Sequence, residues 1–477
     1  MRATQRIDRH HFEGRLALLA NAWAQAVMQD DSFSHKALSG RLPGAGAASA
    51  APKDNAKLIA FYLPQFHRIP ENSAWWGPGF TEWTNVAKAR PNFEGHHQPQ
   101  IPRELGFYDL SSTAVLREQA ELARLAGLSG FCFYHYWFSG RRILEAPVNN
   151  FLASDISFPF CACWANENWT RTWQGDEKSV LLEQHYEEND EERLIESLAP
   201  LFRDARYIKV SEKPLFVVYR IKELPNPTQS IQKWRNAASR LGFPGLHIAV
   251  VDFYDITDPR EVGADALVEF PPHKFNGAEN SPTQPPAVTN PSFQGRFVDY
   301  RSVIAQSAAR EVPPYTLYRG AMPGWDNTAR RQDTPLTVVN SSPALFGAWL
   351  RYLRAWTSIT RASCPDPFLF INAWNEWGEG CHLEPDLRDG LGSIEECGRS
   401  EWVAALDPVA TVDEARARLD REVAVACRAS AIELPESLLR YRGRSPLVHA
   451  ISRLLRPFTF IHRPARSVYQ RLRAARG

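Results

Sequence analysis

Residues 368–385 read FLFINAWNEWGEGCHLEP, and this stretch decides the fold class. It opens with a short apolar run, of the kind that a strand buried on both faces requires. The run then breaks into a polar loop that carries Glu376, Glu379 and Glu384 between tryptophans and glycines. Parallel α/β enzymes present their catalytic groups in such loops, at the carboxyl ends of their strands. The stretch therefore predicts a parallel α/β fold and places the active site in this loop.

Working outward, further apolar runs of the same kind precede this one. The strand candidates are 57–63, 129–134, 158–163, 214–219, 246–251, 264–269, 314–319 and 367–373. Helical patterns lie between them, most clearly at 112–126, 189–203, 228–241 and 342–358. This alternation predicts parallel βαβ units, and eight strands predict an α/β fold of the (β/α)8 TIM barrel type with long βα loops. A doubly wound sheet is the alternative, but no glycine-rich nucleotide-binding loop follows any strand.

The barrel is expected over residues 57–407, with an extension at each end. Residues 1–56 combine a short amphipathic helical pattern at 12–30 with a linker rich in Gly, Ala and Pro, and they show no evident chemistry. Residues 408–477 are expected to form a helical, Arg-rich extension.

Composition argues against several classes of protein. The formal net charge is +1, so the overall charge gives no signal for nucleic acid, and we expect no nucleic-acid partner. The seven cysteines are odd in number and form no Cys-x-x-Cys pair, which argues against a disulfide framework and favours a reducing compartment. Since no apolar run of signal-peptide type or of membrane-spanning length is evident, we expect a cytoplasmic protein.

The stretch 438–477 has a different character from the rest of the chain. It contains ten arginines with interleaved apolar residues, and it has no Asp, Glu or Lys. Such a segment can bind an anionic membrane surface, which would make the protein peripheral on the inner membrane. A solvated basic tail and a nucleic-acid contact are the alternatives.

Aromatic, amide and carboxylate side chains recur after the predicted strands. Flat aromatic faces beside polar groups suit sugar rings, which have an apolar face and a hydroxyl rim. Because the carboxyl ends of barrel strands share one rim, we predict a carbohydrate site there, although any single polar loop can simply be solvated. The predicted substrate-binding residues are Tyr62, Trp83, His135, Tyr136, Asn166, Glu167, Trp169, Trp325, Asp326, Asn327, Trp374, Asn375 and Glu384.

Glu376 and Glu379 are the predicted catalytic pair. Transfer or hydrolysis of a glycosyl group needs a proton donor at the leaving oxygen and a group that stabilises the anomeric centre, and two carboxylates in different environments can divide these roles. The alternative is that one of them caps a helix or pairs with an arginine. We expect no metal and no cofactor, since His96 and His97 are adjacent and poorly placed to share one ion.

Eight ordered motifs also carry a resemblance to a known family. They begin at Tyr62 (YLPQFH), Trp75 (WWGPGFTEWTNV), Gly95 (GHHQPQ), Leu105 (LGFYDL), Gly130 (GFCFYHYWFSG), Cys163 (CWANENWT), Gly324 (GWDNT) and Asn372 (NAWNEWGEG). They resemble the WbsX-type family, which is named as bacterial O-antigen glycosyltransferases and is distantly similar to glycoside hydrolase family 99. The resemblance covers roughly residues 57–400.

This resemblance implies a mechanism as well as a fold. Family 99 enzymes are (β/α)8 barrels that act on α-mannosides with retention, and they are thought to use the 2-hydroxyl of the substrate as the nucleophile. By resemblance, Glu376 would be the base that deprotonates this hydroxyl, and Glu379 would be the general acid/base at the leaving oxygen. The hydrolases usually carry His where this chain has Gly378.

Three functions are therefore compared. The first is a glycosidase or transglycosylase acting on a bacterial surface polysaccharide (O-antigen or lipopolysaccharide) or its lipid-linked precursor. The second is a nucleotide-sugar-dependent glycosyltransferase of O-antigen assembly, against which stands the lack of an Asp-x-Asp motif at a strand end. The third is a carbohydrate-binding protein without catalysis. The expected partner is in each case an oligosaccharide or a lipid-linked glycan.

Overall fold

The computed structural model describes residues 56–171, 176–364 and 366–429. The helix expected at 12–30 and the basic stretch 438–477 lie outside the described residues. No helix in the described ranges combines the length and the apolar character needed to cross a bilayer.

Eight parallel strands form a closed barrel. Their order around the barrel is β1-β15-β12-β10-β9-β8-β4-β2, and β1 pairs with both β15 and β2, which closes the ring. Their bounds are β1 (Lys57–Tyr62), β2 (Gly130–Phe138), β4 (Phe160–Trp164), β8 (Lys213–Val218), β9 (His247–Val251), β10 (Ala266–Val268), β12 (Thr316–Ala321) and β15 (Phe368–Ile371). Each overlaps one of the predicted strands, so the predicted (β/α)8 barrel is confirmed.

The strands are apolar throughout because both of their faces are covered. β2, β4 and β15 are buried at every position. Inside the barrel, the ring of Phe61 lies 4.9 Å from that of Phe270 and 5.4 Å from that of Phe370, measured between ring centroids. Aromatic side chains of several strands therefore fill the centre, as expected for a packed barrel core.

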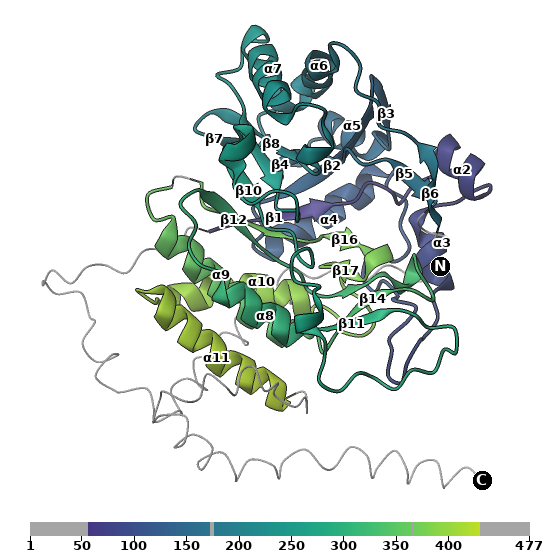
Figure 1. The fold of residues 1–477 in the computed structure, drawn as a ribbon, viewed down its shortest axis with the longest axis vertical. Helices are drawn as coiled ribbons and strands as arrows, with labels where there is room; N and C mark the ends of the chain where they lie inside the picture. The colour runs from purple at the N-terminus through teal and green to yellow at the C-terminus, as the bar shows by residue number, and fades with distance from the viewer. Residues whose placement is uncertain (1–55, 172–175, 365, 430–477) are drawn as a thin grey trace, which may run out of the picture. The chain divides into compact units, whose positions relative to one another are not determined.

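Four outer helices follow the predicted patterns: α4 (Thr113–Leu125), α6 (Asp190–Arg203), α7 (Pro227–Arg240) and α9 (Pro343–Thr360). The structure adds α5 (Ala146–Ala153) and α8 (Tyr300–Ala309), for which no helical pattern was singled out. α7 and α9 each begin with a proline after a polar cap: the side chains of Asn226 and Ser342 accept hydrogen bonds from the backbone N–H groups of Gln229 and Leu345. In Figure 1, α6 and α7 lie above the strands and α8 and α9 lie below them.

Two further helices, α10 (Gly392–Leu406) and α11 (Val412–Ala429), pack beside α9 (Figure 1). Arg351 of α9 lies 2.7 Å from Glu396 of α10 and 2.6 Å from Glu422 of α11. The buried positions of α11 recur at helical spacing, at Ala415, Arg418, Leu419, Val423, Ala426 and Cys427. The described part of the expected C-terminal extension is therefore a helix docked on the barrel.

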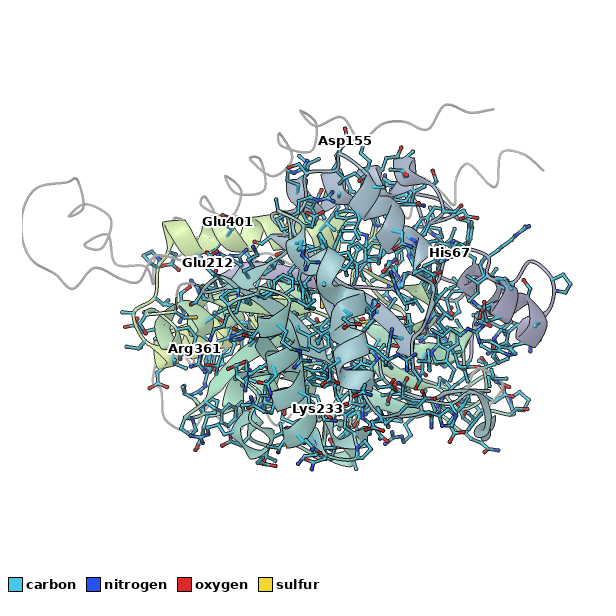
Figure 2. All side chains as sticks on the ribbon, turned by 90° about the horizontal axis from the view of Figure 1, so that it is seen from above. His67, Asp155, Glu212, Lys233, Arg361 and Glu401 are labelled. Atoms are coloured by element: carbon cyan, nitrogen blue, oxygen red, sulfur yellow. The ribbon has the colours of Figure 1, made fainter. Side chains whose placement is uncertain are left out.

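Short elements at the carboxyl end of the barrel carry the polar loops. These are α2 (Pro70–Trp76), α3 (Glu82–Lys88), β3 (Arg141–Ile143), β5 (Trp169–Arg171), β6 (Asp176–Leu182), β11 (Arg296–Asp299), β13 (Trp325–Asp326), η5 (Asn327–Ala329), β14 (Leu336–Val339), β16 (Asn375–Glu376), η6 (Trp377–Glu379) and β17 (Cys381–His382). The remaining short elements are β7 (Lys209–Val210), η2 (Ile221–Glu223), η3 (Pro259–Val262) and η4 (Ala278–Asn280). Figure 2 separates the two ends: His67, which follows β1, lies on the side opposite Glu212 and Arg361, which precede strands.

Candidate active site

Arg330 joins three carboxylates at the carboxyl end of the barrel. Its Nε lies 2.9 Å from Oε1 of Glu82, its Nη2 lies 3.1 Å from Oε2 of Glu376, and its Nη1 lies 2.8 Å from Oε1 of Glu379. The four side chains come from loops after three strands, since Glu82 follows β1, Arg330 follows β12 and both Glu376 and Glu379 follow β15. The predicted catalytic pair is thus held on the two ends of one guanidinium.

The cluster is shielded from water to different degrees. The side chain of Glu82 is 0% exposed, that of Glu376 is 7% exposed, and that of Glu379 is 23% exposed. Burial raises the pKa of Glu376 to about 8, with Arg330 opposing the rise and the two neighbouring carboxylates adding to it. Burial also raises the pKa of Glu379. Because three carboxylates share one cation, the cluster retains a proton at neutral pH.

The loop that carries the pair is anchored to the barrel by Asn375. The side-chain Oδ1 of Asn375 accepts a hydrogen bond from the backbone N–H of Leu63 at 2.7 Å, and its Nδ2 donates to the carbonyl of Leu63 at 3.0 Å. The loop then turns back as the β16–β17 hairpin, and Gly380 at this turn has a φ of +57°, a conformation that favours glycine. Because of this turn, the residues after Gly380 run in a different direction from the segment that carries Glu379.

Gly378 leaves the space that Glu82 and Arg330 occupy. A Cβ at this position would lie 2.2 Å from Oε1 of Glu82 and 2.8 Å from Nε of Arg330. The absence of a side chain at 378 therefore allows the Glu82–Arg330 ion pair to approach the backbone between the two candidate catalytic residues.

These groups open into a cavity of about 190 Å³, which we call the Glu376 pocket. Aromatic side chains dominate its wall, and the residues that complete the lining with Arg330, Glu376 and Glu379 are Gln65, Trp76, Tyr134, Tyr136, Ala165, Glu167, Asn168, Trp169, Thr170, Leu181, Tyr219 and Phe270. The hydroxyl of Tyr136 accepts a hydrogen bond from Nε2 of Gln65 at 3.0 Å, and its ring meets that of Trp169 edge-on. Glu167 is paired with Arg220 at 2.8 Å. Carboxylates among aromatic rings suit a sugar ligand.

Five of the residues predicted for the site line the Glu376 pocket together. They are Glu376, Glu379, Tyr136, Glu167 and Trp169. A direct role of each in binding or catalysis stays a prediction, but the structure places all five around one cavity.

Several other predicted sugar contacts are buried away from this pocket. The hydroxyl of Tyr62 donates to Oε1 of Gln119 at 2.6 Å inside the protein. Trp83, Asn166, Trp374 and Asn375 are also buried outside the lining. Burial lowers the pKa of His135 to about 3, so it is neutral.

Glu384 lies beneath the loop rather than in the Glu376 pocket. Its carboxylate accepts hydrogen bonds from the Tyr108 hydroxyl at 2.8 Å, Nε2 of Gln119 at 2.6 Å and Nε1 of Trp377 at 2.6 Å. Burial raises its pKa to about 7, with these donors opposing the rise. Glu384 thereby supports Trp377, which lies between the two candidate catalytic residues in sequence.

The three residues predicted after β12 also lie outside the Glu376 pocket. Trp325 and Asp326 line a different cavity, and the side chain of Asn327 accepts a hydrogen bond from the backbone N–H of Leu336 at 2.8 Å. Sequence reasoning also missed residues that the structure brings to the pair, above all Arg330 and Glu82. Glu82 lies in the motif that begins at Trp75, and Arg330 comes two residues after the motif GWDNT, so both had a usable signal nearby in the sequence.

Comparison with known proteins identifies one matching family model. A family model described as "Glycosyltransferase WbsX" matches residues 58–396. Two curated relatives from two strains of Xanthomonas campestris pv. campestris, both described as "Uncharacterized protein WxcX", are 45% identical over 347 residues. The match covers 71% of this chain and 49% of each relative, so the chain spans about half the length of these relatives.

Similarity to solved structures is low. A GH99 endo-alpha-mannosidase from Bacteroides thetaiotaomicron is 12% identical with a TM-score of 0.44, and the match covers 77% of this chain and 99% of that one. A "Glycoside hydrolase-like protein" is 12% identical with a TM-score of 0.45, covering 75% of this chain and 97% of that one. The barrel itself is established by the strand pairing described above.

Proposed function

Because this chain belongs to the family described as Glycosyltransferase WbsX, we propose that it cleaves or transfers a glycosyl unit by means of Glu376 and Glu379. Family membership makes it a carbohydrate-active enzyme. The observation that carries the finer proposal is the pairing of both carboxylates with the Arg330 guanidinium in an aromatic-lined pocket at the carboxyl end of the barrel. Such rims carry the catalytic residues of barrel enzymes.

In the proposed chemistry, one carboxyl of the pair carries a proton and the other carries a negative charge. Glu379 is the more exposed of the two, and we assign it the delivery of the proton to the leaving oxygen. Glu376, when ionised, accepts a proton from a hydroxyl of the bound sugar. The oxygen of that hydroxyl then stabilises or attacks the anomeric carbon, while the leaving oxygen takes the proton from Glu379. Arg330 favours the ionised state of whichever carboxyl has lost its proton.

Transfer from a nucleotide sugar is the second candidate, as the family description suggests. The charged groups that line the Glu376 pocket favour the first proposal over it. They are three carboxylates, Glu167, Glu376 and Glu379, and a single arginine that is already paired with two of them. Among the described lining residues, the arginine is therefore already engaged by carboxylates and is poorly available to hold a diphosphate. The third candidate, carbohydrate binding without catalysis, leaves the raised pKa values of the pair without a role.

We propose a bacterial surface polysaccharide of the O-antigen or lipopolysaccharide type, or its lipid-linked precursor, as the substrate. The support is the family, which is described as a glycosyltransferase family, together with the motif resemblance, which implies bacterial O-antigen glycosyltransferases. The sugar, the linkage and the acceptor are questions for the experiment that follows.

The test is turnover of oligosaccharides from the source bacterium's own O-antigen, followed by mass spectrometry with and without nucleotide sugars. We expect cleavage or glycan exchange without a nucleotide sugar, and a loss of roughly 100- to 10,000-fold in Glu376→Gln and in Glu379→Gln. Glu212→Gln is the matched control, because Glu212 is exposed and lies on the opposite side of the molecule from the β1 loop (Figure 2).

Product that forms only when a nucleotide sugar is supplied would favour the second candidate. Glycan binding that persists in wild-type protein with no product under either condition would favour the third.

A further inference from the structure

A second cavity lies in the same group of loops, and no residue lines both it and the Glu376 pocket. We call it the polar cavity. Its volume is about 420 Å³, within the range of roughly 300–1,000 Å³ typical of ligand sites. Its wall comes from the loop 93–100 after β1, the loops around β13 and β14, and residues 380–393 after β15.

The two cavities share a thin wall. Glu379 lines the Glu376 pocket, whereas the next residue, Gly380, lines the polar cavity. Likewise, Arg330 lines the first cavity, and Asp326, four residues earlier, lines the second. A ligand in the polar cavity would therefore lie directly behind the loops that hold the candidate catalytic groups.

Two of the sequence motifs that carry the family resemblance meet at the polar cavity rather than at the Glu376 pocket. These are GHHQPQ at 95–100 and GWDNT at 324–328. They contact each other across the cavity wall: Nε2 of His96 lies 2.7 Å from Oδ2 of Asp326, and Nε2 of Gln98 donates to the same oxygen at 2.6 Å. These contacts fix the loops relative to each other, but they do not use Trp325 or His97, which also line the cavity.

The lining has the composition of a sugar site. The aromatic rings of Phe93 and Trp325 lie among imidazole, amide, hydroxyl and carboxylate groups. The five acidic residues of the lining, Glu94, Asp326, Glu384, Asp386 and Asp389, outnumber the single arginine, Arg388. This charge disfavours a phosphate or a nucleotide and accepts an uncharged or cationic ligand.

Two buried side-chain nitrogens of the lining lack a partner. Nε1 of Trp325 and Nε2 of His97 have no hydrogen-bond partner among the described residues, and Trp325 is only 7% exposed. Buried polar groups in folded proteins are nearly always paired, so an unpaired indole N–H beside a cavity points to an acceptor on a ligand. A sugar hydroxyl is such an acceptor.

We propose that the polar cavity is a second saccharide-binding site, which holds an uncharged or amino-sugar unit of a glycan outside the Glu376 pocket. This inference rests on the proposed function in that the ligand is a glycan. It adds a place where a second chain, or a distant part of the same chain, is held while the Glu376 pocket acts on its own unit.

The test uses full-length protein with Glu376→Gln and Glu379→Gln combined, so that binding is measured without turnover. The probe is the oligosaccharide released by mild acid from the lipopolysaccharide of the source bacterium, with UDP as an anionic comparison. Calorimetry and hydrogen exchange should reveal two sites, with protection both in 93–100 and in 165–170. Trp325→Ala or Asp389→Asn should weaken binding to the polar cavity by about tenfold or more. Tyr136→Ala should weaken binding to the Glu376 pocket.

The outcomes separate this inference from the proposed function. Protection confined to 165–170, unchanged by Trp325→Ala and by Asp389→Asn, would overturn the second site and leave the catalytic proposal standing. Protection in 93–100, together with turnover that stays at the wild-type rate in Glu376→Gln and in Glu379→Gln, would support the second site and overturn the catalytic proposal. If UDP competes for the 93–100 site, the cavity binds nucleotides and the inference is wrong. Asp389→Asn, at a partly exposed position, keeps the test valid if Trp325→Ala fails to fold.

Discussion

Arg330 sets the charge state of the candidate catalytic pair, because its guanidinium is the one cation in contact with Glu82, Glu376 and Glu379 in the part of the chain that the structure describes. Without it, three carboxylates would be buried side by side with no compensating charge, which is strongly unfavourable. With it, one carboxyl can stay ionised while another holds a proton. Arg330 is thus a positioning residue for both glutamates.

The pH dependence of the wild-type reaction follows from this cluster. The pKa of Glu376 is raised to about 8, so its carboxyl is protonated below that pH and ionised above it. Because the proposed base Glu376 acts only when it is ionised, we expect kcat/KM to rise as the pH approaches about 8. In Arg330→Gln the positive charge is absent, so the pKa of Glu376 rises further and this rising limb should move up by roughly 1–3 pH units, together with a large loss of rate.

The measurement is the pH profile of kcat/KM for both proteins. Arg240→Gln, at an exposed position on α7, is the control and should leave the profile unchanged. An Arg330→Gln profile that keeps the wild-type rising limb would show that Arg330 acts on the fold alone.

For single residues, the sequence predicted which residue types form the site better than it predicted where their side chains point. Glu376, Glu379 and Glu384 all lie in one polar loop, and the sequence, which singled out the first two as the catalytic pair, did not show that Glu384 points elsewhere. The β16–β17 hairpin turns Glu384 under the loop, where three donors bind it. Tyr62 was predicted to face a sugar, but the pleat of β1 directs its hydroxyl to Gln119 on α4.

Elements with a strong hydrophobic pattern were predictable from sequence. The barrel strands are apolar because both faces are buried, and α4, α6, α7 and α9 show the expected amphipathic spacing. The short strands of the rim, such as β13 and β16, were not predicted. They are only two residues long, and tertiary contacts rather than local propensity determine them.

The docking of α11 depends on a buried ion pair as well as on apolar packing. Arg351 on α9, with a side chain 7% exposed, pairs with both Glu396 and Glu422. We expect Arg351→Ala to lower the free energy of unfolding by about 1.5–3 kcal/mol, because Glu396 and Glu422 lose their charge-assisted hydrogen bonds to Arg351, while Arg399 and Arg418 still lie near them. Urea unfolding measures the change.

Arg421→Ala provides the comparison on the exposed face of α11, where we expect a change within about 0.5 kcal/mol. Equal effects of the two substitutions would mean that α11 is held by its apolar residues alone.

For the whole molecule, the basic stretch 438–477 leads to a prediction about location. We propose that its ten arginines bring the enzyme to an anionic membrane, where lipid-linked glycans are assembled. Deletion of 438–477 should lower binding to vesicles that contain phosphatidylglycerol by about tenfold or more, and added salt should weaken the binding of the full chain. Sedimentation with vesicles measures the bound fraction, and thermal unfolding of the shortened chain serves as the control.

Unchanged sedimentation after the deletion would favour the solvated-tail interpretation.

The sequence predicted the architecture of the described residues but not where its two cavities lie. Eight apolar runs with helices between them leave few folds open, so the barrel could be predicted. The polar cavity could not, because its walls come from loops more than 200 residues apart in sequence. The 2.7 Å contact between His96 and Asp326, which brings two of these loops together, has no counterpart in any local pattern.

The thin wall between the two cavities also limits how this enzyme can change over evolutionary time. Glu379 faces one cavity and Gly380 the other, so an insertion or deletion in this loop would alter both at once. Substitutions in the segment after β4, which lines only the Glu376 pocket, leave the polar cavity unchanged. Lineages that acquire a new sugar specificity should therefore diverge in that segment while the length of the loop after β15 is preserved.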